Sequence, residues 1–588
     1  MSGAVIGLPI AVAAILATAL VSGQTALYLA AIGIGVLTVC IEAYRDIRAG
    51  DWSLDYIAFL AMTVALFSDE WLAGAVIALM YTGGKALEAY ATRRAEASLS
   101  SLLERIPKTA LIKRGDETFE IPLAEVPTGS TIIVRGGELV PLDGTLASSS
   151  ATLDLANLTG ESLPEEVTRG AYVKSGSVNA GVAFELKVSG ELATSTYAKI
   201  VGLVKDAEND PAPFVRLAAR ANAPFTLVTL AISGGVFAFT GDMARTLAVL
   251  VIATPCPLLI AAPVAFIGGL SRAASKNIIV KTPATLEAIA RVTTVFFDKT
   301  GTLTLGEPQL VDTILLQEGA APRQALSLAA ALEFHSIHPL ARAVINAMHA
   351  ERFTTDPAHD VRETVGVGIE GRLNGFHLSI AQAPAEHHRA GGISLLLKKD
   401  GEPFAVFHFA DQLKDNAKKL LSGLAQEGLK VAVLTGDRKE HAEAMFAGFP
   451  VETHAECTPA DKYRFVEEAR ARGETVAMIG DGLNDAPALA RADVGIVFSG
   501  TENSASIEAA GVAILGHDVE LIRDLLDLSR RSVRIASESV TAGIGLSVVG
   551  MLVAAAGFIV PVEGAILQEG IDVAVILNAL RAAFRPRT

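Results

Sequence analysis

Uncharged apolar runs and long polar blocks alternate along this chain. Three of the runs carry no charge and are long enough to cross a bilayer as helices. Two more are uncharged and of adequate length, and three are shorter or interrupted by polar residues. Together the runs predict eight membrane helices: 4–22, 25–41, 52–68, 71–84, 222–240, 246–271, 539–562 and 564–580.

Two polar blocks, 94–220 and 272–538, separate these runs. Arginines flank the runs on the side of the blocks, whereas the loops on the other side hold Arg245 as their only basic residue. Positive charge accumulates on the cytoplasmic side of membrane proteins. We therefore expect an integral multi-pass protein of the bacterial inner (plasma) membrane, in contact with the lipid bilayer, with both blocks in the cytoplasm.

The two blocks differ in their apolar periodicity. The first contains segments such as "TALIKRG", "STIIVRGGELVPLDGTL" and "GVAFELKVSG", in which apolar and polar residues alternate between glycine turns, so it is predicted to be β-rich. The second alternates strand-like "TTVFFD", "KVAVLTGD" and "TVAMIGDG" with helical stretches such as 411–427 and 459–472. That order predicts a parallel α/β sheet with ligands at the carboxyl ends of its strands.

Composition excludes several classes of protein. The chain has 588 residues, 51% of them hydrophobic and 19% charged, with a mean hydropathy of +0.42. A net charge of −15 argues against a nucleic-acid partner, and no obligatory protein partner is evident. The three cysteines, Cys40, Cys256 and Cys457, form no CxxC pair, so neither a disulfide framework nor a zinc finger is expected.

The strand ends of the second block carry the candidate chemistry. "VFFDKTGTLT" places Asp298 at the end of an apolar strand, where a lone aspartate would usually be a turn residue. However, "VLTGD" and "MIGDGLND" repeat the same strand-then-aspartate pattern, and "TPADK" adds Lys462. Carboxylates, hydroxyls and a cation around one point are the groups that phosphoryl transfer requires.

These motifs resemble those of the P-type ATPases. "LTGES", "DKTGTLT", "TGD" and "GDGLNDAPAL" occur in that family's order, and the resemblance covers nearly the whole chain. It implies a multi-domain α/β membrane protein with an eight-helix transmembrane domain, a β-rich actuator domain and a HAD-like (haloacid dehalogenase-like) α/β phosphorylation domain. An α+β nucleotide-binding domain is inserted into the last of these. The expected segments are helices one to four (1–93), actuator (94–220), helices five and six (221–272), phosphorylation domain (273–312 and 405–530), nucleotide-binding domain (313–404) and helices seven and eight (531–588).

The resemblance also implies a role for each matching residue. Asp298 would attack the γ-phosphate of ATP and become an aspartyl phosphate, with Mg²⁺ held by Asp298, Thr300 and Asp481. Thr435 and Lys462 would contact the phosphoryl group, supported by Asn484 and Asp485; Lys299, Gly436 and Asp437 complete the catalytic motifs. In the actuator, Thr159, Gly160, Glu161 and Ser162 would later dephosphorylate Asp298, with Glu161 positioning water.

The segment 313–404 narrows the resemblance to one branch. "EFHSIHPLA" followed by "GVGIEG" resembles the nucleotide-binding domain of heavy-metal-transporting (type IB) P-type ATPases. The ATP contacts implied are Glu333, His338, Gly366 and Gly368. The chain departs from the branch at Ile337, where glutamate is usual.

Cys256 lies between Pro255 and Pro257 inside an apolar run. A buried cysteine is usually a small hydrophobe, but two prolines leave the carbonyls of Val251 and Ala253 without their helical partners. Free carbonyls at membrane depth are tolerated where they line a cavity or bind something. A thiolate beside them would form a cation site, and the family has its transport site at this position.

The last apolar run adds polar groups to this candidate transport site. Gln568, Glu569 and Asp572 can project toward one face of a helix, and Thr254 can add a hydroxyl. One thiolate with oxygen ligands is too little sulfur for Cu⁺ and unsuited to Ca²⁺ or Mg²⁺, which leaves Fe²⁺, Co²⁺, Ni²⁺ and Zn²⁺.

"TPCP" with "QEGID" resembles the subgroup associated with nickel and iron. The sequence thus predicts ATP-driven export of a divalent transition metal, with Ni²⁺ or Fe²⁺ favoured and Zn²⁺ or Co²⁺ as the alternative. A membrane-tethered, metal-responsive phosphatase or sensor without transport is the alternative from a different class.

Overall fold

The computed structural model describes most of the chain in two compact units. The first unit comprises Met1–Asp154, Pro164–Arg291 and Leu525–Thr588, and the second comprises Leu155–Leu163 and Val292–Asp524. The described residues are 2–49, 56–104, 109–114, 117–154, 164–190, 212–253, 256–304, 306, 308–336, 338–364, 367–387, 392–414, 416–480, 485–498 and 510–584.

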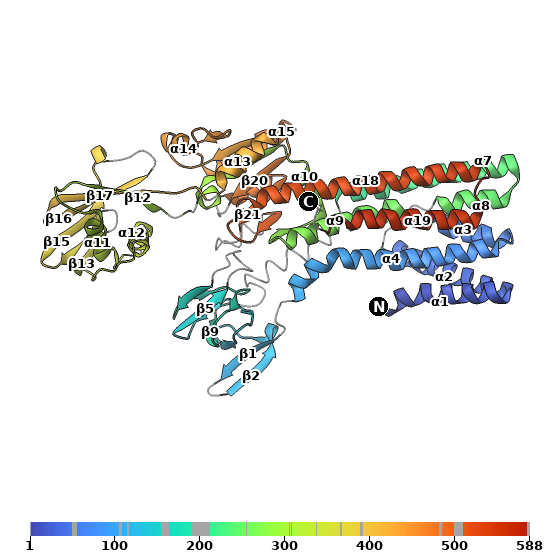
Figure 1. Cartoon of the computed structure of the whole chain (residues 1–588), viewed down its shortest axis with the longest axis horizontal. Helices are drawn as coiled ribbons and strands as arrows, with labels where there is room; N and C mark the ends of the chain where they lie inside the picture. The colour runs from blue at the N-terminus through green and yellow to red at the C-terminus, as the bar shows by residue number, and fades with distance from the viewer. Residues whose placement is uncertain are drawn as a thin grey trace. The chain divides into compact units, whose positions relative to one another are not determined.

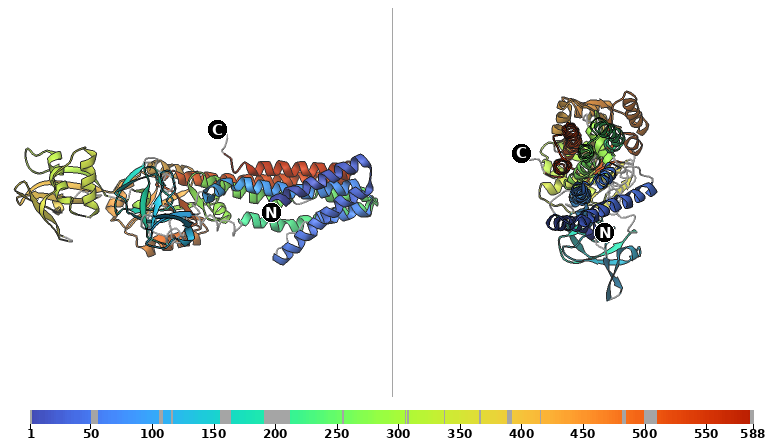
Figure 2. Two further views of the ribbon diagram at one scale, coloured as in Figure 1. Left: turned by 90° about the horizontal axis from the view of Figure 1, so that it is seen from below. Right: turned by 90° about the vertical axis from the view of Figure 1, so that its right-hand side faces the viewer.

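Long helices of the first unit lie side by side (Figures 1 and 2). They are α1 (Ser2–Ser22), α2 (Thr25–Ala49), α3 (Tyr56–Phe67), α4 (Trp71–Glu104), α7 (Pro213–Thr240), α8 (Met243–Ile252), α9 (Cys256–Ala274), α18 (Leu521–Ala555) and α19 (Pro561–Leu580). Helices occur in all eight predicted runs. Among the described residues, α2, α7 and α18 are long and apolar enough to cross a membrane by themselves, and α1, α3, α8 and α9 contain shorter apolar stretches.

The run 246–271 differs from the prediction of one helix. Helix α8 ends at Ile252, where Ala253 donates its N–H to the carbonyl of Leu250, and α9 begins at Cys256. Residues 254 and 255 lie outside the described part. A proline has no N–H to donate, so Pro255 and Pro257 each remove one bond from the α-helical ladder, and two such losses close together favour a break here. The run therefore contains two helices that meet near the Pro-Cys-Pro sequence.

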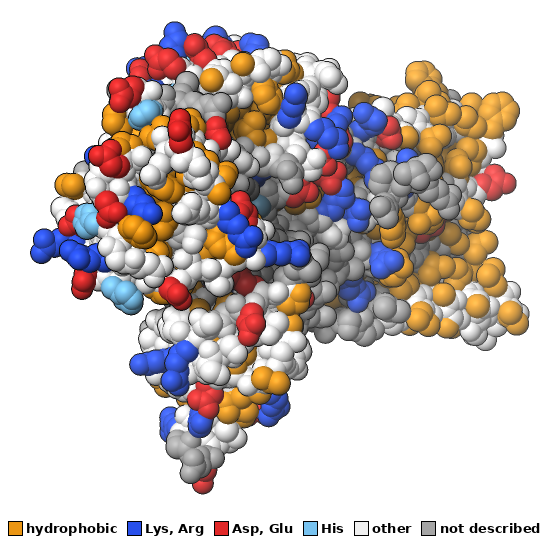
Figure 3. Space-filling model, turned by 60° about the vertical axis from the view of Figure 1, so that its left-hand side comes forward, with side chains coloured by type: hydrophobic (Ala, Val, Ile, Leu, Met, Phe, Trp, Pro, Cys, Tyr) orange, Lys and Arg blue, Asp and Glu red, His pale blue; other side chains and the backbone are white. Residues whose placement is uncertain are grey.

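Glycines bring these helices close together. Ile252, the last residue of α8, packs against Gly550 of α18 and Gly564 of α19, and a Cβ atom at Gly550 would come within 2.8 Å of its side chain. On the outside, large apolar side chains such as Leu227, Phe239 and Ile566 are exposed. Figure 3 shows hydrophobic side chains gathered over the helical region. Lipid is the solvent that suits such a surface.

The described residues of the polar block between α4 and α7 form mainly strands, as predicted. A six-stranded sheet has the order β2-β1-β3-β9-β4-β7, and a three-stranded sheet has the order β6-β5-β8. The strands are β1 (Thr109–Arg114), β2 (Glu117–Pro122), β3 (Thr131–Val134), β4 (Gly144–Leu146), β5 (Ser150–Asp154), β6 (Glu165–Thr168), β7 (Tyr172–Val173), β8 (Val178–Asn179) and β9 (Phe184–Val188). The helix α10 (Pro283–Ala290) and strand β10 (Ile278–Val280) follow α9 in the same unit.

A parallel sheet forms the centre of the second unit and confirms the predicted α/β pattern. Its strands follow the order β22-β21-β20-β11-β18-β19. They are β11 (Thr294–Asp298), β18 (Lys430–Leu434), β19 (Glu452–His454), β20 (Val476–Gly480), β21 (Val494–Phe498) and β22 (Val512–Ile514). The helices between them are α13 (Ala417–Gln426), α14 (Lys439–Met445), α15 (Pro459–Ala471) and α16 (Ala486–Arg491).

The predicted helix over 411–427 begins later than expected. Asn416, with a positive φ of 68°, precedes the first turn of α13, and Leu413 pairs with Thr304 in an isolated β-bridge. Residues 411–414 are therefore a loop that lies against the segment following β11, which has consequences for the candidate site below.

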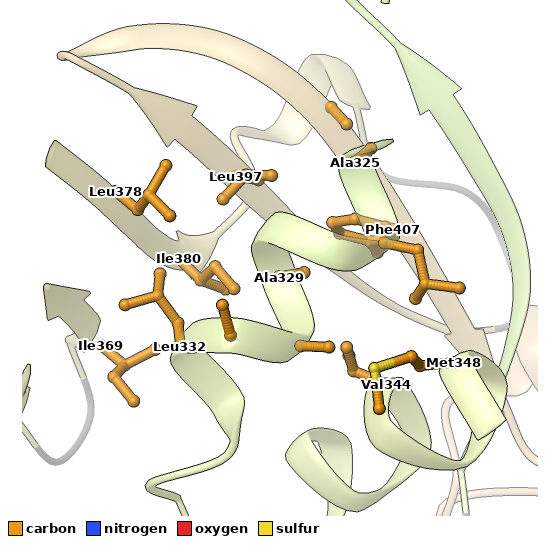
Figure 4. Packing of buried hydrophobic residues seen from close by; sticks show 14 of the residues in the cluster. Ala325, Ala329, Leu332, Val344, Met348, Ile369, Leu378, Ile380, Leu397 and Phe407 are labelled. Atoms are coloured by element: carbon orange, nitrogen blue, oxygen red, sulfur yellow. The ribbon is translucent and has the colours of Figure 1, made fainter. Parts of the chain in front are cut away.

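An antiparallel sheet with two helices is inserted after β11. Its strand order is β12-β17-β16-β15-β14-β13. The elements are β12 (Gln309–Leu315), α11 (Pro322–Glu333), α12 (Pro339–Ala350), β13 (His359–Thr364), β14 (Gly368–Leu373), β15 (Phe376–Gln382), β16 (Ile393–Lys399) and β17 (Glu402–Ala410). Figure 4 shows Leu332, Val344, Met348, Ile380 and Phe407 filling the space between the two helices and the sheet. This cluster gives the insert a hydrophobic core of its own.

Candidate functional site

The order of the parallel strands brings the predicted catalytic motifs to one edge of the sheet. Strand β11 lies between β18 and β20, with Asp298 opposite Leu434 and Phe297 opposite Ile479. Lys299 and Thr435, which follow β11 and β18, therefore leave the sheet at the edge where β20 also ends.

Lys462 joins two carboxylates at this edge. Its ammonium group donates hydrogen bonds to Asp298 Oδ1 and, at 2.7 Å, to Asp485 Oδ1. All three side chains are buried. Burial by itself would lower the pKa of Lys462, but the charges of Asp298 and Asp485 outweigh it and raise that pKa. The lysine is therefore held as a cation beside the Asp298 carboxylate.

Gly480 makes room for the second carboxylate. A Cβ atom at Gly480 would lie 2.6 Å from Asp485 Oδ2, so a side chain here would displace the carboxylate that Lys462 contacts. The glycine in "MIGDG" thus has a steric role that spacing alone does not reveal.

Lys299 makes a second set of ion pairs. Its Nζ lies 2.6 Å from Asp437 Oδ2 and 3.9 Å from Asp411 Oδ2. The Asp437 N–H donates to Thr435 Oγ1 at 3.1 Å, which ties the "TGD" turn together. Lys299, Asp411 and Asp437 line a cavity of about 240 Å³ together with His441, Ala444 and Met445.

Lys414 and Asp411 were missed by the sequence analysis. The Lys414 ammonium donates to the Gly301 carbonyl at 2.7 Å and lies 4.7 Å from the centre of the Phe498 ring. Gly301, with φ of 72°, forms the sharp turn after Asp298. A signal for Asp411 was present in the sequence, because "FHFADQLK" repeats the pattern of an apolar strand followed by aspartate, but nothing in it marks Lys414.

Replacing Lys414 by methionine is expected to slow phosphorylation of the protein by ATP about tenfold, the equivalent of one hydrogen bond to a charged group. The carbonyl of Gly301 would lose its donor, and the turn that carries Lys299 and Thr300 would loosen. Rapid-quench measurement of phosphoenzyme formation tests this. Lys414→Arg, which keeps a positively charged donor, should restore most of the rate, and replacing the exposed Lys419 by methionine should leave it unchanged.

Two of the predicted nucleotide residues, Glu333 and His338, lie at the end of α11 and the start of α12, and Gly368 begins β14. His338 caps α12, with Nδ1 accepting the N–H of Leu340 at 3.2 Å. Ser336 Oγ accepts from the His338 N–H and donates to Glu363 Oε1 at 2.9 Å. Gly368 has φ of 149°, and a Cβ atom there would overlap the Ile380 carbonyl, so only glycine fits.

Glu333 is buried at the end of α11. Burial, with a smaller contribution from the negative charge of Glu363, raises the pKa of Glu333 to about 7. A carboxyl group that titrates near neutral pH close to the loop of His338 is consistent with a ligand-binding position.

Glu333 should make the stability of the insert depend on pH. The pKa of Glu333 is raised in the folded protein. Its contribution to the free energy of unfolding is therefore fully present below the pKa of the unfolded chain, near 4.5, and is lost as pH rises through about 7. At pH 8, Glu333→Gln is therefore expected to slow hydrogen exchange of the α11 amides, because it raises the free energy of local opening by up to roughly 3 kcal/mol. At pH 5 the same substitution should change the exchange rates little. The exposed Glu318→Gln is the matched control. Equal protection in wild type and Glu333→Gln at pH 8 would contradict the prediction.

A buried polar pair lies between α18 and α19. Gln568 Nε2 donates to Asp572 Oδ1 at 2.9 Å, and Ser547 Oγ of α18 donates to Gln568 Oε1 at 3.2 Å. Gln568 is fully buried, Asp572 is buried and Glu569 is half-buried. Ser547 is a further residue that the sequence analysis missed, because its own run contains no charge to mark it.

Several predicted residues lie outside the described part of the chain. They are Thr159, Gly160, Glu161 and Ser162 of the actuator motif, Asp481 and Asn484 of the catalytic motif, Gly366 and Ile337 of the nucleotide motif, and Thr254. Cys256 begins α9, but its side chain is outside the description. Within the described residues, no group of three or more His, Cys, Asp or Glu is arranged to hold a metal ion.

Comparison with known proteins places the chain in a family. A model of the P-type ATPase actuator domain matches residues 104–205, and a model of haloacid dehalogenase-like hydrolases matches 292–493. A probable cadmium-transporting ATPase of Alkalihalophilus pseudofirmus is 30% identical over an alignment of 588 positions, which covers 95% of this chain and 81% of the relative. The chain belongs to the heavy-metal (type IB) P-type ATPases.

Other matches agree with the family. A probable copper-exporting P-type ATPase V of Mycobacterium tuberculosis is 34% identical over 553 residues, covering 89% of this chain and 72% of the relative. The crystal structure of a zinc-transporting PIB-type ATPase in the E2.Pi state has a TM-score of 0.66 at 29% identity and covers 98% of this chain and 99% of its own. This P-type ATPase therefore has the family's actuator, HAD-like phosphorylation and nucleotide-binding domains, and it hydrolyses ATP to pump ions across a membrane.

Proposed function

We propose that this P-type ATPase exports a divalent transition metal ion from the cytoplasm through an aspartyl-phosphate intermediate. The observation that carries the proposal is the buried Gln568–Asp572 pair on α19, held by Ser547 of α18. A membrane anchor for a phosphatase or sensor has no need for a buried carboxylate and amide between its helices, and intramembrane acids usually mark ion sites.

Phosphoryl transfer is assigned to Asp298. Its carboxylate attacks the γ-phosphorus of ATP, a P–O bond to Asp298 forms, and ADP leaves with the electrons of the broken bond. Lys462 donates a hydrogen bond to this carboxylate and places positive charge beside the phosphoryl oxygens. Lys299, fixed by Asp437, supplies a second cation at the same edge of the sheet. The actuator residue Glu161 is assigned to positioning water for the later hydrolysis of the aspartyl phosphate.

The phosphorylation site suits Mg²⁺. Carboxylate and hydroxyl oxygens are the ligands this ion prefers, and Thr302 Oγ1 is buried beside the Asp298 turn without a hydrogen-bond partner among the described residues. Asp298, Thr300 and Asp481 are the residues assigned to hold it. Bound there, the ion would neutralise charge on the phosphates of ATP.

The nucleotide is assigned to the inserted domain. Glu333, His338, Gly366 and Gly368 are the proposed contacts, and Gly368 is the one whose conformation excludes every other residue. The domain limits expected from the sequence are proposed, except that the insert expected at 313–404 is widened to 309–410 so that it contains the whole of β12 and β17.

The cargo is proposed from the donor groups at the break between α8 and α9 and on α19. Cys256, Thr254, Gln568, Glu569 and Asp572 offer one thiolate and several oxygens, a set suited to a borderline divalent ion. Motif resemblance favours Ni²⁺ or Fe²⁺. Relatives named for cadmium and manganese transport and a zinc-transporting structure support a divalent cargo in general, and the relative named for copper export makes Cu⁺ an ion to include in the test.

The test is ATP hydrolysis by the purified protein in lipid with Fe²⁺, Ni²⁺, Co²⁺, Zn²⁺, Cd²⁺, Mn²⁺ and Cu⁺ titrated separately. One or more divalent ions should stimulate hydrolysis, and Asp572→Asn should abolish that stimulation. Glu563→Gln, an exposed acid on the same helix, is the matched control. Stimulation by Zn²⁺ or Cd²⁺ in preference to Ni²⁺ and Fe²⁺ would replace the proposed cargo. Metal-independent hydrolysis would instead favour the phosphatase or sensor.

A further inference from the structure

The C-terminal end of α9 has two adjacent glycines that are in contact with two different segments. A Cβ atom at Gly268 would lie 3.0 Å from the backbone nitrogen of Ala583, just beyond α19. A Cβ atom at Gly269 would overlap Ser532 Oγ of α18. The missing side chains therefore allow α9 to approach α18 on one side and the segment after α19 on the other.

Arg531 fastens the end of α19 to α18. Its Nη2 donates to the Arg581 carbonyl at 2.9 Å and its Nη1 donates to the Phe584 carbonyl at 3.0 Å. The last carbonyls of a helix have no partner within the helix, and a positive charge near them is also favourable for the helix dipole. Two parallel donors from one rigid guanidinium fix both distance and orientation.

Helix α4 takes part through the ring of Phe584. The guanidinium carbon of Arg94 lies 5.5 Å from the centre of that ring, within the range of a cation–π contact. We call these residues (Arg94, Gly268, Gly269, Arg531 and 581–584) the helix junction. All of them belong to the first unit.

The helix junction joins the helices that carry the proposed cargo ligands. Helix α9 begins with Cys256, α18 carries Ser547, and α19 carries Gln568 and Asp572. Arg581 follows Asp572 by about nine positions, which is about 13 Å along a helix. Since a helix is stiff over that length, fixing its end restricts how Asp572 can move relative to α18 and α9.

We propose that Arg531 and Phe584 are positioning residues for the cargo site, in that their hold on the end of α19 keeps Gln568 and Asp572 in register with α9 and α18. The inference rests on the proposed function of that pair as a cargo site. Neither residue contacts the cargo. Their effect is on affinity, because a site whose ligands are held in place loses less conformational freedom when an ion binds.

The experiment compares two phosphorylation reactions of the full-length protein in lipid. Phosphorylation by ATP is measured while Ni²⁺ and Zn²⁺ are titrated separately, and phosphorylation by inorganic phosphate is measured without either ion. Arg531→Met is expected to raise the half-maximal ion concentration about tenfold, the effect of losing roughly one charged hydrogen bond, while phosphorylation by inorganic phosphate changes less than about twofold. Arg531→Lys, which can still donate to the carbonyls, should restore most of the affinity.

A second variant and a control make the result decisive. Phe584→Leu keeps an apolar side chain but removes the ring over which Arg94 lies, so it should shift the ion titration in the same direction by a smaller factor. Arg534→Met removes an exposed arginine three residues away on α18 and should shift neither reaction. An unchanged ion titration in both Arg531→Met and Phe584→Leu would overturn the proposal, and so would an equal loss of both phosphorylation reactions. If none of the ions titrated for the proposed function stimulates phosphorylation of Asp298 by ATP in wild type, the proposed function fails instead.

Discussion

Asp298→Asn is expected to abolish incorporation of the γ-phosphate of ATP into the protein and to reduce ATP hydrolysis at least about a thousandfold, as removal of a catalytic nucleophile does. Asparagine has nearly the same shape as aspartate, but its neutral amide oxygen is a far weaker nucleophile than the carboxylate. The change would also remove the ion pair with Lys462. Labelling with γ-³²P-ATP, followed by treatment of the labelled protein with hydroxylamine, tests both the residue and the acyl-phosphate bond.

Two comparisons separate loss of chemistry from loss of structure. The Asp298→Asn variant should still bind ATP, because the predicted nucleotide contacts lie in the inserted domain with its own core. The control is replacement of Asp312, a residue of β12, by asparagine. This change removes an acid from the same unit and should leave labelling intact. If the Asp298→Asn variant still became labelled at a hydroxylamine-sensitive site, another carboxylate would have to be the nucleophile.

The strands and catalytic motifs of the second unit could be predicted because their signal is local. "TTVFFD", "KVAVLTGD" and "TVAMIGDG" are apolar runs that end in glycine or aspartate, and they form β11, β18 and β20. Parallel pairing then places their ends together, and Lys462 of α15 meets Asp298 there although 164 positions separate the two residues. The eight apolar runs were likewise visible because the bilayer requires long uncharged segments.

What the sequence did not reveal depends on contacts between distant segments. Lys414 is an ordinary lysine in "DQLK" until the chain folds it against Gly301 and Phe498. Ser547 lies in an uncharged run and acquires its importance from Gln568 on the next helix. The start of α13 at Ala417 instead of 411 has the same cause, because Leu413 pairs with Thr304 and so cannot join a helix.

Lys462→Met is expected both to inactivate the protein and to destabilise its phosphorylation domain. The change leaves Asp298 and Asp485 buried near each other without the cation between them, and breaking a buried ion pair on one side costs about 3–5 kcal/mol. For a domain of this size that corresponds to a melting temperature lower by roughly 10 °C.

The stability that Lys462 contributes depends on pH. The pKa of Lys462 is raised in the folded protein, so its contribution to stability is complete below its unfolded value near 10.5 and is lost only at higher pH. At pH 7, thermal unfolding of Lys462→Met should therefore show the full loss, and phosphorylation by ATP should fall at least about a hundredfold. The double variant Lys462→Met, Asp485→Asn removes one of the two negative charges that repel each other, and it should recover part of the stability but not the activity. Replacing the exposed Lys439 of α14 by methionine is the matched control. If stability and activity recover together, Lys462 only neutralises Asp485. If stability alone recovers, the positive charge of Lys462 acts on the phosphoryl group.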